Sequence, residues 1–223
     1  MAWGIEFIHN QVRNILNQDN RFETPEVIDQ NVNQAVSRIF NKLIGADSQT
    51  YQVGNPVSVR GGVQVNATNA AALVKLIDTS TETVTTGSFD IPEDCVLILS
   101  IFSGNNELEW LKEGQVGKRL TSLIKPPTTE YPVWYYGASQ SITVKPDTIT
   151  SVKLKYIKDP ETVVYGYTID SNNGDYVFDP DTSVDVPFPQ YMWDNIVNET
   201  LVLMGIPVQN QLAIQVANQQ NNR

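Results

Sequence analysis

The one histidine of the chain, His9, is the residue to test first for catalysis, because Ser-His-Asp and Cys-His arrangements both need an imidazole. It follows Ile8 in a segment whose apolar residues recur at helical spacing. We therefore interpret His9 as a partly exposed helix residue rather than a general base. With one histidine and one cysteine, Cys95, the chain cannot build a zinc site from His and Cys ligands. We predict that the protein is not an enzyme and binds no cofactor.

Aspartate and asparagine side chains gather around residue 175 and could hold calcium through hard oxygen ligands. These side chains are Asp170, Asn172, Asp175, Asp179 and Asp181. Their spacing departs from the EF-hand, with Gly174 where a ligand is expected and Asp175 where the glycine should be. The plainer interpretation is turn chemistry, in which Asp and Asn side chains bond to their own backbone.

Glu107 and Glu109, beside Trp110, could form an acid pair under a sugar-stacking aromatic ring, as in glycosidases. Two residues that are two positions apart share a face on a strand but diverge on a helix. Because a helix is possible in this segment and nothing else in the sequence builds a cleft there, a carboxylate-based hydrolase is the weaker hypothesis.

Four aromatic residues lie within one short segment: Tyr131, Trp134, Tyr135 and Tyr136. Aromatic residues at strand spacing usually fill a core or a contact between proteins. We take Trp134 and Tyr135 as candidate interface residues. Carbohydrate binding is the alternative.

The charge of the chain argues against nucleic acid and anionic membranes as binding partners. Fifteen basic and 25 acidic residues give a net charge of −10, and like charges repel. The longest apolar run, residues 95–102, is far shorter than the ~20 residues needed to cross a bilayer. The first ten residues lack the basic start and apolar stretch of a signal peptide. We expect a protein that is made and kept in a cytosol, without a membrane partner.

Helices are predicted near both ends of the sequence. Apolar residues of Ile5–Leu16 recur at helical spacing. A second helix is predicted from an N-cap at Thr24, with Pro25 in its first turn, to a left-handed stop at Gly45. Near the other end, Tyr191–Met204 has an amphipathic pattern and is followed by Gly205.

The middle of the sequence has mainly β patterns. We predict a hairpin over 57–65 around Arg60-Gly61-Gly62, a loop or edge strand over 79–88, and a strand over 96–102 that is buried on both faces. Short strands are predicted over 133–136, 141–144 and 151–157, and a hairpin over 163–178. Helices are possible over 70–77 and 107–124.

Together these elements predict the α+β class, with a bundle of N- and C-terminal helices and an inserted β-rich middle domain. The expected parts are N-terminal helices over 1–45, a β-rich region with one or two helices over 46–189, and a C-terminal helix with a polar tail over 190–223.

Several motifs, in this order, resemble the ring-forming neck and tail structural proteins of crAss-like and related short-tailed bacteriophages. The motifs are FETPEVIDQNVNQAVSRIFNKLIG, FDIPEDCVLILSIF, RLTSLIKPPTTEYPVWYYG, ITVKPD, VKLKYIKDPE and LVLMGI. They span most of the chain from Phe22 to Ile206. None of them holds catalytic residues, and their order carries most of the likeness.

The resemblance implies a homo-oligomeric ring in the head-to-tail connector of a virion, twelvefold where it follows portal symmetry. Its partners would be the portal protein and neighbouring tail or ring proteins. Phage DNA would pass through the ring without specific contacts, and an acidic lumen would keep the DNA from sticking.

The last segment of the sequence, residues 208–223, is rich in Gln and Asn. Its apolar residues Leu212, Ile214 and Val216 are too few for a core of their own. We expect this tail to become ordered on a neighbouring protein in the assembly, which makes these three residues candidate interface residues.

Overall fold

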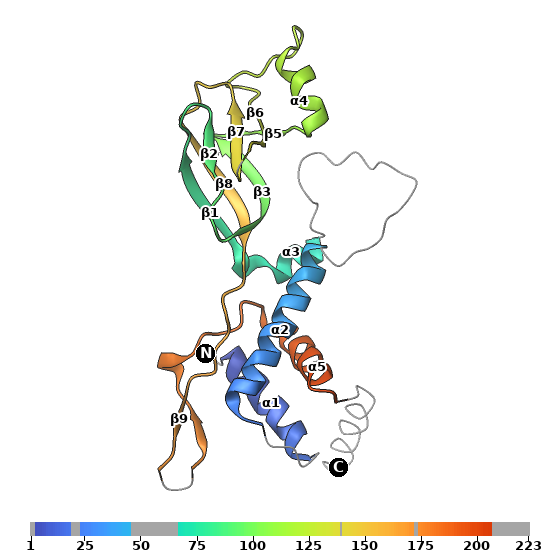
Figure 1. The fold of residues 1–223 in the computed structure, drawn as a ribbon, viewed down its shortest axis with the longest axis vertical. Helices are drawn as coiled ribbons and strands as arrows, with labels where there is room; N and C mark the ends of the chain where they lie inside the picture. Colours follow the sequence, from blue (N-terminus) through green and yellow to red (C-terminus); the bar gives the residue numbers. More distant parts are fainter. Residues whose placement is uncertain (1–2, 19–22, 46–66, 139, 172–173, 207–223) are drawn as a thin grey trace, which may run out of the picture. The chain divides into compact units, whose positions relative to one another are not determined.

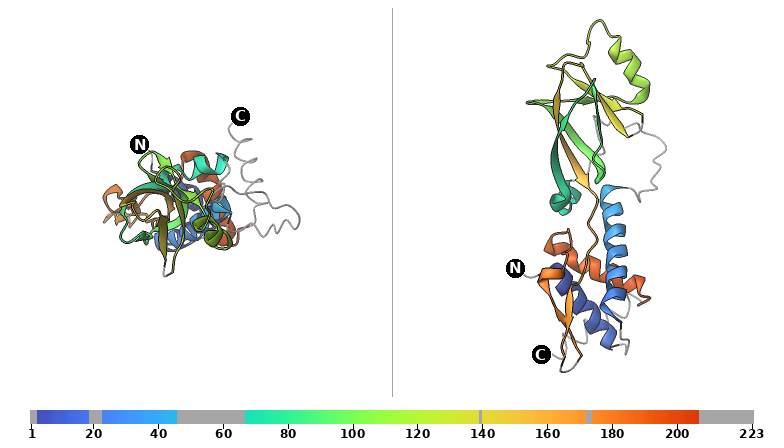
Figure 2. Two further views of the ribbon diagram at one scale, coloured as in Figure 1. Left: turned by 90° about the horizontal axis from the view of Figure 1, so that it is seen from above. Right: turned by 60° about the vertical axis from the view of Figure 1, so that its left-hand side comes forward.

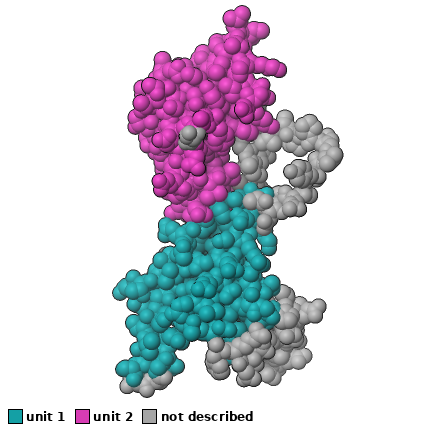
Figure 3. Space-filling view, in the orientation of Figure 1, with its two compact units in different colours: residues 1–48, 160–223 teal, residues 49–159 magenta. Residues whose placement is uncertain are grey.

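The computed structural model is a mixed α and β protein, with helices at both ends of the chain and a middle rich in β-sheet (Figure 1). It describes residues 3–18, 23–45, 67–138, 140–171 and 174–206. The chain divides into two compact units, coloured in Figure 3. Unit 1 comprises residues 1–48 and 160–223, and unit 2 comprises residues 49–159. No helix in the described ranges is long and apolar enough to cross a bilayer.

Helices α1 (Gly4–Gln18) and α2 (Pro25–Ile44) confirm the two helices predicted near the start of the chain. Helix α2 begins after Thr24, whose carbonyl accepts hydrogen bonds from the N–H groups of Val27 and Ile28. The expected cap by the Thr24 hydroxyl is absent. At the other end, Gly45 adopts the predicted left-handed conformation, with φ 81°.

Helix α5 (Trp193–Leu203) follows a 3₁₀ turn, η3 (Gln190–Met192), and confirms the predicted helix near the other end. Its termination at Gly205, with φ 77°, is also as predicted. Helix α5 contacts both α1 and α2 within unit 1 (Figures 1 and 2). The buried faces that serve these contacts include Ile28, Val32 and Phe40 of α2 and Trp193, Ile196 and Val197 of α5.

A short antiparallel hairpin of β9 (Tyr167–Ile169) and β10 (Tyr176–Phe178) completes unit 1 and confirms the hairpin predicted there. A 3₁₀ turn, η2 (Pro180–Thr182), follows it. Residues 160–189 therefore belong to unit 1, whereas the sequence pattern had grouped them with the β-rich middle. The reason is tertiary, since their backbone bonds to side chains of α2, as described below.

Two four-stranded sheets build unit 2, in the orders β1-β8-β3-β4 and β2-β7-β6-β5 (Figures 1 and 2). Their neighbouring strands are antiparallel, except that β5 and β6 are parallel. The strands of the first sheet are β1 (Ile77–Thr83), β8 (Ser151–Lys158), β3 (Cys95–Ser103) and β4 (Asn106–Glu107). Those of the second are β2 (Ser88–Asp90), β7 (Ser141–Lys145), β6 (Val133–Tyr136) and β5 (Glu109–Trp110).

One hydrophobic cluster draws on both sheets of unit 2, so its core lies between them. Members include Ile98, Ile101 and Leu154 from the first sheet, and Phe89, Ile142 and Val144 from the second. The strands predicted over 133–136, 141–144 and 151–157 are confirmed. Of the two alternatives for 79–88, a loop or an edge strand, residues 79–83 belong to the edge strand β1.

Three predictions for unit 2 are wrong in part. Strand β3 is present, but it is not buried on both faces. One face meets the core, whereas Val96 is 42% exposed. The helix predicted over 107–124 is only α4 (Glu113–Leu120), because 106–110 pairs as β4 and β5. The short helix near residue 70 is split into α3 (Ala67–Ala72) and a 3₁₀ turn, η1 (Val74–Leu76). The hairpin predicted over 57–65 lies outside the described residues.

Candidate functional site

The only histidine is buried in unit 1, with 0% of its surface exposed. Its Nε2 lies 2.8 Å from Asp29 Oδ1, and its ring stacks on Tyr165 with centroids 4.1 Å apart. The prediction of a partly exposed His9 is therefore wrong. His9 is four residues after Ile5 and three before Val12, so it shares the apolar face of α1 with both.

Burial lowers the pKa of His9 below its usual value, although the hydrogen bond and the charge of Asp29 act in the opposite direction. The positive charge of Arg13 lowers the pKa further. The guanidinium of Arg13 lies over the Tyr165 ring, 5.1 Å from its centroid. His9 is therefore part of the packing of unit 1, where its ring contacts Asp29 and Tyr165.

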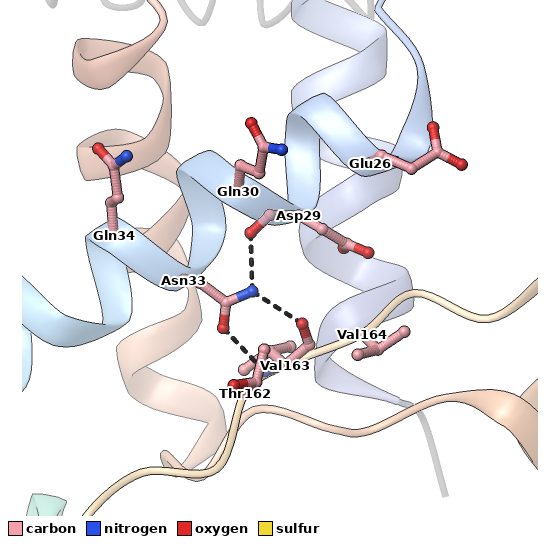
Figure 4. A pocket seen from close by; sticks show the side chains of 8 residues that line it. All are labelled: Glu26, Asp29, Gln30, Asn33, Gln34, Thr162, Val163 and Val164. Carbon is pink, nitrogen blue, oxygen red and sulfur yellow. Dashed lines mark hydrogen bonds between the residues drawn. The ribbon is translucent and has the colours of Figure 1, made fainter.

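Asn33 of α2 holds the extended chain at Val163 by a pair of hydrogen bonds (Figure 4). Its Nδ2 donates to the Val163 carbonyl at 2.8 Å, and its Oδ1 accepts from the Val163 N–H at 2.8 Å. Two residues further on, the Tyr165 N–H donates to the Asp29 carboxylate at 3.1 Å. The side chains of α2 thus bond to this segment as a neighbouring strand would, and fix it against the helix.

A hollow of about 500 Å³ lies between α2 and this segment, and we call it the α2 groove (Figure 4). Its lining residues are Glu26, Asp29, Gln30, Asn33, Gln34, Thr162, Val163 and Val164. Glu26 accepts a hydrogen bond from the Tyr167 hydroxyl, which lowers the pKa of the Glu26 carboxyl. No lysine or arginine occurs over residues 22–37 or 159–222, which contain both walls of the groove. The charged residues that line the α2 groove, Glu26 and Asp29, are both acidic.

The most exposed large apolar residues of the described chain are Leu123 and Ile124, at 98% and 97%. They lie in the loop after α4, and we call residues 118–127 the tip (Figure 1). Hydrogen bonds brace its backbone: Thr121 N–H donates to the Gly117 carbonyl, and Lys125 N–H donates to Ser122 Oγ at 3.1 Å. The two apolar side chains thus project from a turn that is held in place locally.

The tip is basic, in contrast to the chain as a whole. Residues 114–129 contain Lys118, Arg119 and Lys125 but no aspartate or glutamate. Arg119 is used internally, because its Nη2 lies 3.2 Å from Glu109 Oε2. Lys118 and Lys125 are exposed on either side of the apolar pair.

The candidate interface residues from the sequence have different surroundings. Trp134 is 5% exposed and belongs to the core cluster of unit 2, where its ring contacts those of Trp110 and Tyr136. Tyr135 beside it is half-buried. The other three candidates, Leu212, Ile214 and Val216, lie outside the described residues. The surface of this aromatic segment is therefore supplied by Tyr131 and Tyr136 rather than by Trp134.

Two of the carboxylate groups singled out from the sequence, those of Glu109 and Asp179, have structural partners. Glu109 pairs with Arg119, and Glu107 lies exposed on β4. Asp179 Oδ1 accepts from the Asp181 N–H at 3.1 Å, which is turn chemistry of the expected kind. Among the described residues, no group of three or more His, Cys, Asp or Glu side chains is placed to hold a metal ion, and Asn172 lies outside them.

Cys95 is half-buried at the start of β3 and packs against the core of unit 2. Burial, reinforced by the charge of Asp94, raises the pKa of its thiol to about 11. A thiol with this pKa is protonated at neutral pH and is a poor nucleophile.

No protein-family model matches the chain, and no curated protein matches it.

Sequence reasoning missed both the His9–Asp29–Asn33 set and the exposed pair of the tip. A signal for the first was present, since Asp29 and Asn33 are four residues apart on one helical face of α2. The tip was missed because Leu123 and Ile124 were taken as the end of an amphipathic helix, which stops at Leu120 instead.

Proposed function

We propose that this chain is a virion structural protein, which forms a ring in the head-to-tail connector of a short-tailed phage, docks near the portal and lines the DNA exit channel. The order of the sequence motifs supports this reading. The observation that carries it is the pair Leu123 and Ile124, almost fully exposed on a braced turn. Apolar side chains presented in this way favour contact with another protein, because burial there removes their area from water.

The proposal assigns different tasks to the two units. We take α1, α2 and α5 as one helical bundle, and the two sheets of unit 2 as the carrier of the tip. Unit 1 has 14 acidic and five basic residues, whereas unit 2 has 11 acidic and ten basic residues. In a ring, the acidic unit is the better lining for a channel, because it repels the phosphates of passing DNA.

Electron microscopy of the purified chain, mixed with the portal protein of the same phage, tests the proposed function. We expect a ring attached to the portal, and a largely monomeric protein when the chain is alone. Light scattering on the isolated protein is the control for templated assembly. A chain that neither binds the portal nor adds a ring to it would overturn the proposal.

The tail over 208–223 gives a second test of the same function. If its apolar residues dock on a neighbour, deletion of Val208–Arg223 leaves the fold intact and sharply lowers incorporation into the portal complex. Circular dichroism checks the fold of the truncated chain. Equal incorporation of both chains would show the tail to be dispensable.

Carbohydrate binding is the alternative function, and the exposure of Tyr131 and Tyr136 is the observation that favours it. Exposed aromatic rings can stack on sugar rings. A glycan-binding module would bind sugars as an isolated protein and lose this binding in a variant with both tyrosines changed to alanine. The connector protein that we propose would bind none.

A further inference from the structure

We propose that the tip of one copy of this chain seats in the α2 groove of the next copy. This inference rests on the proposed ring and names its subunit contact: Leu123 and Ile124 enter the groove, while Lys118 and Lys125 face its acidic walls. The occupant of the groove is thus a second copy of this chain.

The tip supplies an apolar anchor that is already in its bound form. Leu123 and Ile124 are almost fully exposed, and the bonds at Thr121 and Lys125 hold the turn that carries them. A braced loop loses little further conformational entropy when it docks. Burial of the two aliphatic side chains then favours binding, because it removes their apolar area from water.

The α2 groove has the size and the lining to receive this anchor. Its volume of about 500 Å³ gives room for two aliphatic side chains. Val163 and Val164 provide apolar wall, and Val164 is 38% exposed. The floor is fixed, because Asn33 bonds both the N–H and the carbonyl of Val163. A fixed groove and a braced tip form a pair of preformed surfaces.

Charge decides which surface the tip meets. The tip has basic residues and no acid over 114–129, while the segments of the groove walls have acids and no base over 22–37 and 159–222. Glu26 is a lining residue with an exposed carboxylate. Opposite charges at the rim of a contact steer encounter and set its register. Two tips, or two grooves, would repel each other.

The geometry of such a contact leads to a ring. The tip lies in unit 2 and the groove in unit 1, so the contact joins two different surfaces of the same chain. A contact between two different surfaces generates a ring where the rotation between successive copies closes, and a two-fold dimer with reciprocal tip–groove contacts is the smallest such ring.

Charge exchange between the two surfaces tests the contact. Variant K118E/K125E reverses the tip, and variant Q30K/Q34K makes the groove basic through two exposed glutamines of α2. Equal amounts of ¹⁴N- and ¹⁵N-labelled chains, concentrated so that a weak contact between otherwise monomeric chains is populated, are treated with a carbodiimide, which joins lysines to carboxylates in contact. In the wild type we expect mixed-isotope products that link Lys118 or Lys125 to Glu26 or Asp29. Variant Q30K/Q34K, which keeps the reactive lysines of the tip, should lower the yield of tip–groove products at least tenfold, whereas K118E/K125E removes these lysines and serves as the background for the exchange. The four substitutions together should restore the yield, with the cross-links now formed by the lysines introduced on α2.

The matched control is K153E/K155E, which makes the same charge change at two exposed lysines of β8 and should leave the yield unchanged. Variant L123S/I124S, which keeps every charge, should also lower the yield. Circular dichroism of each variant checks that it is folded. Wild-type products that join other surfaces, or a yield that no tip or groove variant changes, would overturn the contact.

Microscopy of the same variants with the portal separates this inference from the proposed function. If rings form on the portal with wild type and variants alike, the tip–groove contact is wrong and the ring proposal stands. If the four substitutions together restore the cross-links but no ring forms on the portal, the contact stands and the connector function is wrong.

Discussion

Both fully buried polar side chains of the described residues, His9 and Thr200, lie in unit 1, whereas the core cluster of unit 2 consists of aliphatic and aromatic side chains. Unit 1 joins two stretches of chain that are separated by the whole of unit 2. Its extended segment at Val163–Tyr165 has only an isolated bridge to residue 184 in place of a sheet ladder. The side chains of Asp29 and Asn33 take over the task that backbone pairing performs in unit 2. Directional polar bonds are therefore expected to matter more in unit 1.

The largest expected effect comes from an apolar residue, and it sets the scale for the comparison. Phe40 is buried on α2 in unit 1. Phe40→Ala should lower the free energy of unfolding of unit 1 by ~3–5 kcal/mol, because it removes buried area and leaves a cavity. Hydrogen exchange of peptides from unit 1, recorded at increasing denaturant concentration, measures this loss. A loss below ~1 kcal/mol would mean that Phe40 is not a core residue.

Removal of the Asp29 carboxylate tests the polar part of unit 1 directly. Asp29→Ala should cost ~1–3 kcal/mol, because it leaves the His9 imidazole and the Tyr165 N–H without their acceptor. The control is Glu26→Ala, which removes an exposed hydrogen bond to Tyr167 and should cost less. Equal losses in the two variants would contradict a special role for the buried network.

Local signals made the helices of unit 1 predictable. Thr24, Pro25 and Gly45 mark the ends of α2 within a few residues of chain, and the apolar stripe between them specifies the buried face. The segment over 107–124 was not predictable in this way. Its first part pairs with β3 and β6. This pairing prevails over the helical spacing of the leucines, and no local pattern in the segment indicates it.

The candidate sites also combine features that local spacing predicts with features that only the tertiary fold determines. The position of His9 on the apolar face of α1 can be inferred from its spacing to Ile5 and Val12. Its stacking on Tyr165 cannot, because the two residues are brought together only by the tertiary fold. The exposure of Leu123 and Ile124 likewise depends on where α4 ends, and the apolar character of the two residues alone predicted burial.

The pH dependence of stability offers a further contrast between the units. Burial lowers the pKa of His9 in the folded state below the 6.5 of a free histidine. The unfolded chain then binds the proton more readily than the folded chain does. The contribution of His9 to the stability of unit 1 is therefore complete above pH 6.5 and is lost as the pH falls toward the folded pKa. The groups that face His9 are Asp29, which opposes the shift, and Arg13, which adds to it. Unit 2 contains no histidine and should lack this step.

Hydrogen exchange at a series of pH values between 7 and 5 measures the two units in one sample. We expect the protection of α1 and α2 to fall over this range more than that of β3 and β8. His9→Phe, which removes the titrating group and keeps a ring to stack on Tyr165, should remove the difference. A wild-type profile that matches the variant would show that His9 does not contribute to the pH dependence.

The smallest effect on stability is expected where the side chains are most exposed. Leu123→Ser together with Ile124→Ser removes two large apolar groups from unit 2, yet both are as exposed in the folded chain as in the unfolded one. No buried area is lost, so the free energy of unfolding should change by no more than ~0.5 kcal/mol. Leu154→Ala, at a fully buried position of β8 in the same unit, should cost ~2–5 kcal/mol.

The comparison of these two variants separates residues that stabilise unit 2 from residues that are only exposed on its surface. If the serine variant unfolds as easily as Leu154→Ala, then Leu123 and Ile124 pack against the protein itself, and the tip is part of the core. If its stability is that of the wild type while its tip–groove cross-links fall, the two side chains serve contact alone. Their apolar surface would then be kept for the assembly, since it contributes nothing to the fold of a single chain.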